Sequence, residues 1–208
     1  IKKKFFTFFF SCYYCNFRLK TIFMKHLTCM IVRYIFSLLI FLCINFVILK
    51  AGELKIGDSA PDFTLDVATK DTVLDEGFTL SKHFGNKPIV LAFYPADWSG
   101  GCTKEMCTMR DNFSDLQKLN AEIVGISGDY VYSHKAWAKN LELPFFLASD
   151  FKHDVAKSYN SFNDTAGFNK RTVYVIDTKG KIAYIDLEYK ARDTASFNKL
   201  KDALEKIQ

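Results

Sequence analysis

Five consecutive apolar residues, Ile89 to Phe93, form the most constraining stretch of this sequence, within the segment KPIVLAFYP. A short, uniformly apolar run of this kind favours a strand buried on both faces over one with a solvent-exposed face. Such a strand needs neighbours in a sheet and layers of helix above and below it. The stretch therefore predicts an α/β domain with a central sheet.

The chain after about residue 54 supplies the other elements of that domain. Apolar periodicity and turn residues predict strands at 60–66, 72–80, 122–129, 145–150, 171–177 and 181–189, and helices at 102–120, 131–142, 153–160 and 195–208. Alternating strands and helices come first, and a hairpin and a helix close the chain. This order predicts a mixed central sheet with helices on both faces, the layout of the thioredoxin-like fold.

Residues 1–50 have a different composition from the rest of the chain. They hold eight of the 28 Lys and Arg residues, ten of the 21 Phe residues and no Asp or Glu. We interpret residues 1–29 as a basic, Phe-rich extension without a folded core and residues 30–52 as a signal peptide or an N-terminal membrane anchor, which leaves residues 53–208 as the folded domain. Basic residues before the apolar stretch predict an exported protein, periplasmic or secreted, that contacts a membrane only through this hydrophobic leader.

The charge of the folded domain differs from that of the whole chain. The chain has a net charge of +5, but residues 51–208 hold 20 Lys and Arg against 23 Asp and Glu, which is a net charge of −3. The domain also has no basic run with interleaved aromatic residues. We therefore expect no binding to nucleic acid.

Two cysteines of the segment PADWSGGCTKEMC, Cys102 and Cys107, can be packing residues, metal ligands or a reactive pair. Packing suits Cys102, which lies on the apolar stripe of its helix, but not Cys107, which lies about 140° further round. A zinc site needs four ligands, commonly in two close pairs. The three His residues after residue 51 have no such spacing, and we expect them to be solvated helix and loop residues: His83, His134 and His153.

The reactive interpretation fits the position of Cys102 best. The thiolate is the nucleophilic form of cysteine, and the start of a helix, with unpaired N–H groups and a positive dipole, favours that form. Ser99 can cap this helix, and Pro95 can fix the bend that leaves the strand. Arg171, at the start of a later strand, is expected next to the strand of Phe93, where its charge would also favour the thiolate.

The same segment resembles the active site of the peroxiredoxins. Their motif is Pro, three residues, Thr or Ser, two residues, Cys, and here it is filled by Pro95, Ser99 and Cys102. A second Cys five residues later, as at Cys107, resembles the bacterioferritin-comigratory or Q-type branch of the family. GDSAPDFTL at 57–65, VGISGD at 124–129 and KRTVYVIDTKGKI at 170–182 are also similar to that family.

The resemblance implies a thioredoxin-like fold and a thiol-dependent peroxidase of the atypical 2-Cys kind, with no cofactor and no metal. Its substrates would be hydrogen peroxide and organic hydroperoxides, its reductant a thioredoxin-like or other dithiol protein, and its state a monomer or weak dimer. The implied site has Cys102 as peroxidatic cysteine, Cys107 as resolving cysteine, the Ser99 hydroxyl on thiolate and peroxide, Pro95 as a shield, the Arg171 guanidinium, and Glu105 holding that arginine.

Two alternatives have weaker support in the sequence. A thioredoxin-like disulfide oxidoreductase would need a CxxC pair and a Pro before the late strand, but the pair is CxxxxC and residue 172 is Thr. A non-catalytic or copper-binding module of the same fold would not need the complete catalytic set, which is present here as Pro95, Ser99, Cys102 and Arg171.

The spacing of the cysteines adds a requirement for any disulfide between them. Along an intact helix, residues five apart have Cα atoms about 8.6 Å apart, whereas a disulfide needs less than about 7 Å. The helix start must therefore unwind to join Cys102 to Cys107, and Gly100 and Gly101 are expected to ease that step.

Overall fold

The structure, a computed structural model, describes residues 33, 52–190 and 193–207. The chain divides between Gly52 and Glu53 into two units, Ile1–Gly52 and Glu53–Gln208. The predicted extension and leader, 1–29 and 30–52, fall almost wholly outside the described residues, so these domain boundaries stay predictions. Among the described residues, no helix combines the length and apolar character that a membrane crossing requires.

Unit Glu53–Gln208 is built on a mixed sheet. Within the described residues its strand order is β2-β1-β5-β4-β3-β8-β9. β3 and β4, and β4 and β5, pair in parallel, and the outer pairs are antiparallel. The strands are β1 Thr64–Ala68, β2 Val73–Thr79, β3 Ile89–Phe93, β4 Glu122–Ser127, β5 Phe146–Ser149, β8 Thr172–Ile176 and β9 Ile182–Asp186. A short hairpin, β6 Phe162–Asn163 and β7 Phe168–Asn169, stands apart from this sheet.

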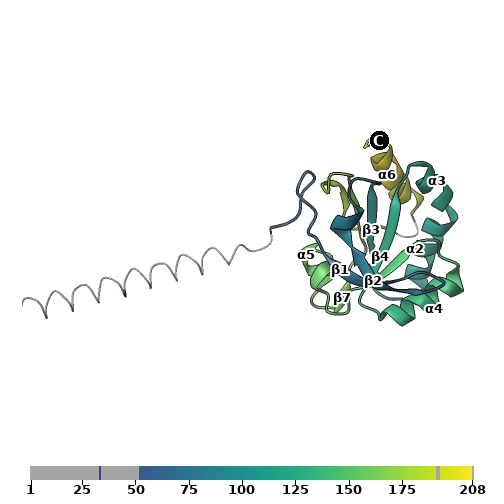
Figure 1. The fold of residues 1–208 in the computed structure, drawn as a ribbon. Coiled ribbons are helices and arrows are strands. Elements are labelled where there is room, and N and C mark those ends of the chain that lie inside the picture. Colours follow the sequence, from purple (N-terminus) through teal and green to yellow (C-terminus); the bar gives the residue numbers. More distant parts are fainter. Residues whose placement is uncertain (1–32, 34–51, 191–192, 208) are drawn as a thin grey trace, which may run out of the picture. The chain divides into compact units, whose positions relative to one another are not determined.

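Helices cover both faces of the sheet (Figure 1). One face carries α2 Gly100–Asp111, α3 Phe113–Lys118, α4 Val131–Leu141 and α6 Thr194–Glu205, and the other carries the 3₁₀ helix η1 Leu80–His83 and α5 Asp154–Ser158. Side chains alternate along each strand, so Val90 and Ala92 of β3 belong to the first core and Leu91 and Phe93 to the second. The predicted fold class, a mixed sheet with helices on both faces, is confirmed.

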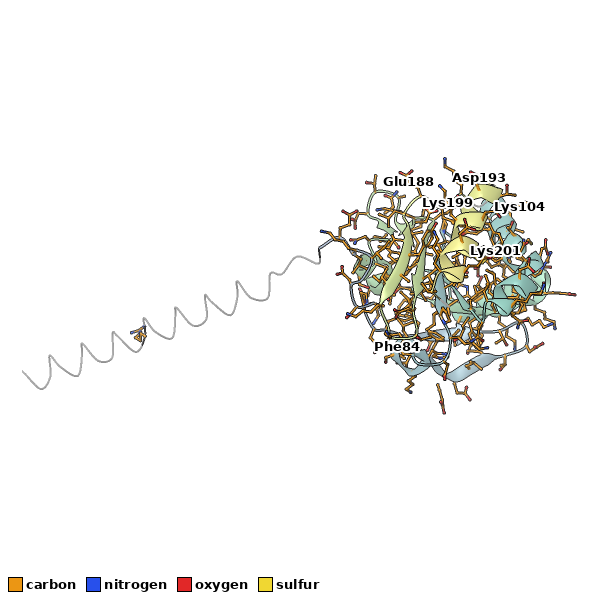
Figure 2. The ribbon with its side chains drawn as sticks, turned by 90° about the horizontal axis from the view of Figure 1, so that it is seen from above. Phe84, Lys104, Glu188, Asp193, Lys199 and Lys201 are labelled. Atoms are coloured by element: carbon orange, nitrogen blue, oxygen red, sulfur yellow. The ribbon has the colours of Figure 1, made fainter. Side chains whose placement is uncertain are left out.

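The helix α6 is amphipathic, with one apolar face turned to the core. Phe197, Leu200 and Leu204 are buried against the sheet at helical spacing. Lys199, labelled on this helix in Figure 2, is exposed, and Lys201 Nζ lies 3.8 Å from Asp115 Oδ2 of α3. The side chain of Asp193 caps the helix by accepting from the backbone N–H of Ala195.

The helix predicted over 102–120 is two helices, which corrects the sequence interpretation. The break falls at Asn112, whose side-chain amide donates to the carbonyl of Thr108 at 2.8 Å. Asparagine readily makes such local bonds in place of regular helix bonds. Directly after the break, Phe113 packs near Phe145, with ring centroids 6.2 Å apart.

Candidate active site

The start of α2 places Cys102 at the carboxyl end of β3. Ser99 is the N-cap: its Oγ accepts from the backbone N–H of Cys102 at 3.4 Å and donates to the carbonyl of Ala96 at 3.2 Å. Cys102 is in the first turn and is fully buried. The expected cap is therefore present, with the hydroxyl proton of Ser99 on a backbone carbonyl in this state.

The start of β8 brings Arg171 to the same place. β3 and β8 pair so that Phe93 lies opposite Thr172, and Arg171 precedes Thr172 directly. One guanidinium nitrogen, Nη2, donates to Cys102 Sγ at 3.2 Å, and Nη1 donates to Glu105 Oε2. Three of the residues singled out in the sequence thus form one contact chain from carboxylate through guanidinium to sulfur.

The burial of Glu105 makes this chain electrostatically unusual. Burial raises the pKa of Glu105, the Arg171 guanidinium partly offsets this effect, and the result is a pKa of about 7. Burial alone lowers the pKa of Arg171, but the Glu105 and Cys102 groups together raise it above its usual value. The second carboxyl oxygen, Glu105 Oε1, is buried without a hydrogen-bond partner. The arginine therefore keeps its charge at the sulfur, while its carboxyl partner titrates near neutral pH.

Gly101 has a role at this site that differs from the expected one. A Cβ at Gly101 would lie 2.7 Å from Arg171 Nη2, whereas a Cβ at Gly100 would meet nothing within 4 Å. The guanidinium is held by Glu105 and Cys102, so it has little freedom to give way. The two glycines are thus not equivalent. Gly101 leaves space for the Arg171 guanidinium, whereas the main effect of Gly100 is on the flexibility of the helix start.

Pro95 and Cys107 are the remaining two residues of the predicted site. Pro95 is partly buried in the bend directly after β3. Cys107 is partly exposed on α2, packs against the first core, and is a free thiol, as is Cys102. Because α2 is continuous through both cysteines, the geometric requirement for unwinding holds in this structure.

The prediction that the three histidines are solvated is wrong for His134, which is fully buried on α4. Its ring lies between Asp97 and the carbonyl of Ala148. Sequence reasoning missed both His134 and Asp97. The signal was there, since Val131, His134, Trp137 and Leu141 recur at helical spacing and all lie on the buried stripe. Within the described residues, no three His, Cys, Asp or Glu residues are grouped as a metal site would require.

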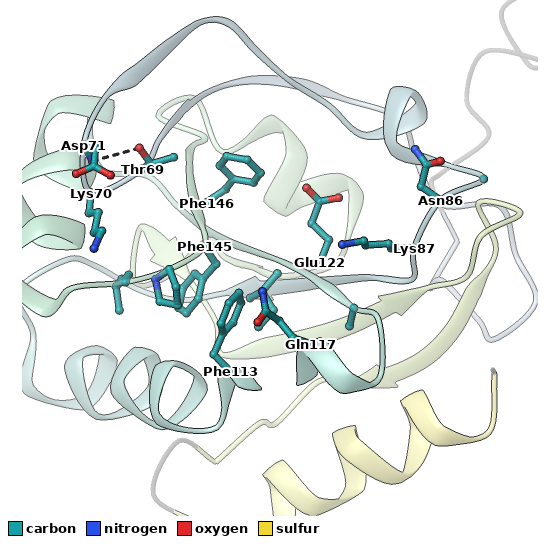
Figure 3. A pocket seen from close by; sticks show the side chains of 15 residues that line it. Thr69, Lys70, Asp71, Asn86, Lys87, Phe113, Gln117, Glu122, Phe145 and Phe146 are labelled. Atoms are coloured by element: carbon teal, nitrogen blue, oxygen red, sulfur yellow. Dashed lines mark hydrogen bonds between the residues drawn. The ribbon is translucent and has the colours of Figure 1, made fainter. Parts of the chain in front are cut away.

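The unit has two hollows of different size, and the predicted site residues do not line the larger one. A cavity of about 1110 Å³ lies at the amino ends of the parallel strands, between α3 and the starts of β4 and β5 (Figure 3). Its lining includes Phe113, Gln117, Glu122 and Phe145, and none of the predicted site residues. A smaller hollow of about 650 Å³ includes Arg171 and Tyr189. Ligands of open α/β sheets bind at the carboxyl ends of strands, so we place the site at Cys102 rather than in the larger hollow.

The family model described as the AhpC/TSA family matches residues 56–185. This chain belongs to the AhpC/TSA family. Membership rests on well over half of the chain and covers the strand, turn and helix that hold Cys102. The predicted resemblance to the peroxiredoxins is confirmed.

Individual relatives narrow this assignment to the Q-type branch. The chain is 44% identical over 135 residues to "Peroxiredoxin Q, chloroplastic" of Triticum aestivum, covering 64% of this chain and 59% of that protein. It is 44% identical over 131 residues to the protein of the same name from Populus jackii, covering 62% and 58%. The matched region thus spans less than two thirds of the length of these relatives.

A solved structure supports the same branch. The "Peroxidoxin BcpB" structure from Mycobacterium tuberculosis is similar with a TM-score of 0.65 and 31% identity, covering 75% of this chain and 99% of that one. Its coverage agrees with the extent of unit Glu53–Gln208.

The relatives overturn the predicted localisation. The basic residues before the apolar stretch predict an exported protein, periplasmic or secreted. The similar proteins from Triticum aestivum, Populus jackii and Oryza sativa are named as chloroplastic. The inference was wrong because a basic, acid-free leader does not by itself distinguish export signals from organelle targeting segments, which are also acid-poor.

Proposed function

We propose that this protein is a thiol-dependent peroxidase that reduces hydrogen peroxide and organic hydroperoxides. The observation that carries the proposal is the Arg171 Nη2–Cys102 Sγ contact of 3.2 Å at the capped start of α2. A guanidinium beside a helix start favours a thiolate and offers donors to a peroxide placed at the sulfur. Membership of the AhpC/TSA family supports the same activity.

The first chemical step transfers one oxygen atom to sulfur. The Cys102 thiolate attacks one peroxide oxygen, the S–O bond forms, and the O–O bond breaks. The other oxygen leaves as hydroxide or alkoxide and takes a proton from water. Arg171 donors and the Ser99 hydroxyl would stabilise the negative charge that moves onto this oxygen. For Ser99 this requires that its proton leave the carbonyl of Ala96, to which it donates here.

The second step forms a disulfide within one chain. The Cys107 thiol condenses with the Cys102 sulfenic acid, and the Cys102 oxygen leaves as water with the thiol proton. The start of α2 must unwind for the sulfurs to meet. A thioredoxin-like or other dithiol protein then reduces the disulfide by exchange and is itself oxidised to a disulfide. We expect the protein to be a monomer or a weak dimer in solution.

Pro95 and Glu105 support the reacting groups in this proposal. Pro95, in the bend after β3, would shield the Cys102 sulfur from solvent. Glu105 would hold the guanidinium in place through its contact with Nη1. Neither group exchanges atoms with the peroxide.

Cysteine variants test the proposal directly. Cys102→Ser should abolish peroxide consumption in a stopped-flow assay, because a serine hydroxyl is not ionised at neutral pH. Cys107→Ser is the matched control and should keep a fast first reaction. Peroxide turnover that survives Cys102→Ser would show that the nucleophile lies elsewhere.

A further inference from the structure

The turn between β3 and α2 is tied to α4 by a buried polar network centred on Asp97. Asp97 Oδ1 accepts from the Tyr94 hydroxyl at 2.8 Å, and Oδ2 accepts from the Ser133 hydroxyl at 2.7 Å. His134 Nδ1 lies 3.0 Å from Asp97 Oδ2, and both of these side chains are 0% exposed. Tyr94 and Asp97, which precede α2, are thus linked to Ser133 and His134 in the first turn of α4.

The hydrogen bonds of this network hold His134 from two sides. A backbone carbonyl can only accept, so His134 Nε2, 3.2 Å from the Ala148 carbonyl, donates to it. On the other side of the ring, Nδ1 lies 3.1 and 3.0 Å from the two Asp97 carboxyl oxygens. Asp97 and His134 are thus a buried polar pair, and removal of one partner leaves the other buried without its hydrogen bond, which destabilises the fold.

The residue after Asp97, Trp98, is 57% exposed but also contacts α4. Trp98 has a left-handed φ of 59°, and its Nε1 donates to Ser133 Oγ at 3.3 Å. The backbone N–H of Asp97 donates to Asp129 Oδ2 at 2.8 Å. Gly100, two residues later, is exposed, and nothing lies near the position of its Cβ. The chain is therefore fixed by hydrogen bonds to neighbouring elements up to Trp98, whereas Gly100 has no side-chain contact that would fix it.

We propose that Asp97 and His134 are a positioning pair that keeps the turn before Cys102 in place while the start of α2 unwinds to form the disulfide. This inference rests on the proposed function. The pair touches neither peroxide nor sulfur, and acts through the turn that carries Ser99. Its effect is to confine unwinding to residues after Trp98, so that Cys102 returns to the same position beside Arg171 in every cycle.

Hydrogen exchange followed by mass spectrometry tests the confinement. In the wild-type disulfide form, the amide of residue 97, which donates to Asp129, should stay protected while those of residues 102 and 103, which donate to Ser99, lose protection. In the disulfide form of Asp97→Asn all three amides should exchange, because the asparagine keeps the shape but replaces one accepting oxygen by a donor. Asp202→Asn, an exposed carboxylate on α6, is the matched control and should follow wild type. Loss of protection at the residue 97 amide in the oxidised wild type would overturn the inference.

Rates of the two chemical steps give a second, independent readout. Asp97→Asn and His134→Gln should each slow sulfenic acid formation about 10-fold, because the first turn of α2 is less well placed. Neither should slow the following disulfide step, because the start of α2 can unwind whether or not the pair holds the turn before it. The double variant should resemble each single one, as expected of two groups that act together. Equal slowing of both steps, or additive effects, would contradict a positioning pair.

The same samples separate failure of this inference from failure of the proposed function. Intact mass shows whether Cys102 is oxidised and whether the disulfide forms; a Cys102 that stays reduced would refute the proposed peroxidase, and a missing disulfide would refute its second step. The dithiol forms can still be compared: Asp97→Asn should reduce protection of the residue 97 amide there as well. Unchanged protection in that comparison would refute the positioning pair regardless of the chemistry.

Discussion

Replacing Glu105 by Gln should change how the stability of the protein depends on pH. Glu105 is fully buried, one of its oxygens has no hydrogen-bond partner, and its pKa is raised by burial from 4.5 to about 7 despite Arg171. The folded protein thus favours the neutral carboxyl group. The variant removes this titration while keeping an oxygen that can accept from Arg171.

The sign and size of the effect follow from that difference in pKa. Below pH 4.5 the group is protonated in both folded and unfolded chains, and its contribution is fully present. Between pH 4.5 and 7 only the unfolded chain ionises, so stability is lost as pH rises, and above 7 the loss is complete. One pH unit corresponds to about 1.4 kcal/mol, so the 2.5-unit difference gives about 3 kcal/mol.

Thermal unfolding of wild type and Glu105→Gln between pH 4 and 8 measures this effect. Wild type should lose stability relative to the variant by about 3 kcal/mol over that range, or roughly 6–12 °C in Tm for a domain of this size. Other titrating groups are common to both proteins and cancel in the difference. Glu76→Gln, an exposed carboxylate on β2, should run parallel to wild type. Parallel curves for Glu105→Gln, or a wild type that gains stability with pH relative to it, would refute the reasoning.

Three further substitutions follow from the geometry of α2. Gly101→Ala should slow sulfenic acid formation on Cys102 about 100-fold in stopped-flow assays, because its Cβ displaces the Arg171 guanidinium; an unchanged rate would show that the arginine gives way freely. Gly100→Ala should leave that step unchanged and slow disulfide formation roughly 4-fold, because alanine stabilises a helix by up to ~1 kcal/mol over glycine; an unaffected disulfide rate would argue against unwinding at this point. Cys107→Ser should accumulate sulfenic and then sulfinic acid on Cys102 under excess peroxide, visible by mass; a stable dithiol-like mass would remove its resolving role.

The sheet was predictable because burial on two faces leaves a clear mark in the sequence. The run Ile89–Phe93 is β3 with the same bounds. Strand 171–177 corresponds to β8 Thr172–Ile176, and its pairing with β3 follows from the fold class. The small β6–β7 hairpin was missed because strands of two residues are too short for any periodicity to show.

The site was predictable where single residue types carry the chemistry. The sequence predicts Arg171 near Cys102, and the two side chains are in contact at 3.2 Å. The missed features depend on packing between distant segments. His134 looks like an ordinary polar residue until α4 is laid on the sheet beside Asp97, and the need for glycine at 101 appears only when the guanidinium has been placed.

The central claim is that Cys102 is oxidised by peroxide and then joined to Cys107 within one chain. Intact-mass spectrometry after one equivalent of hydrogen peroxide tests it most directly. The wild-type protein should lose two hydrogen atoms as a monomer, and peptide mapping should find the Cys102–Cys107 disulfide. A dominant disulfide between chains, or a wild type that stops at the sulfenic acid, would contradict the account and leave a peroxidase resolved by an external thiol.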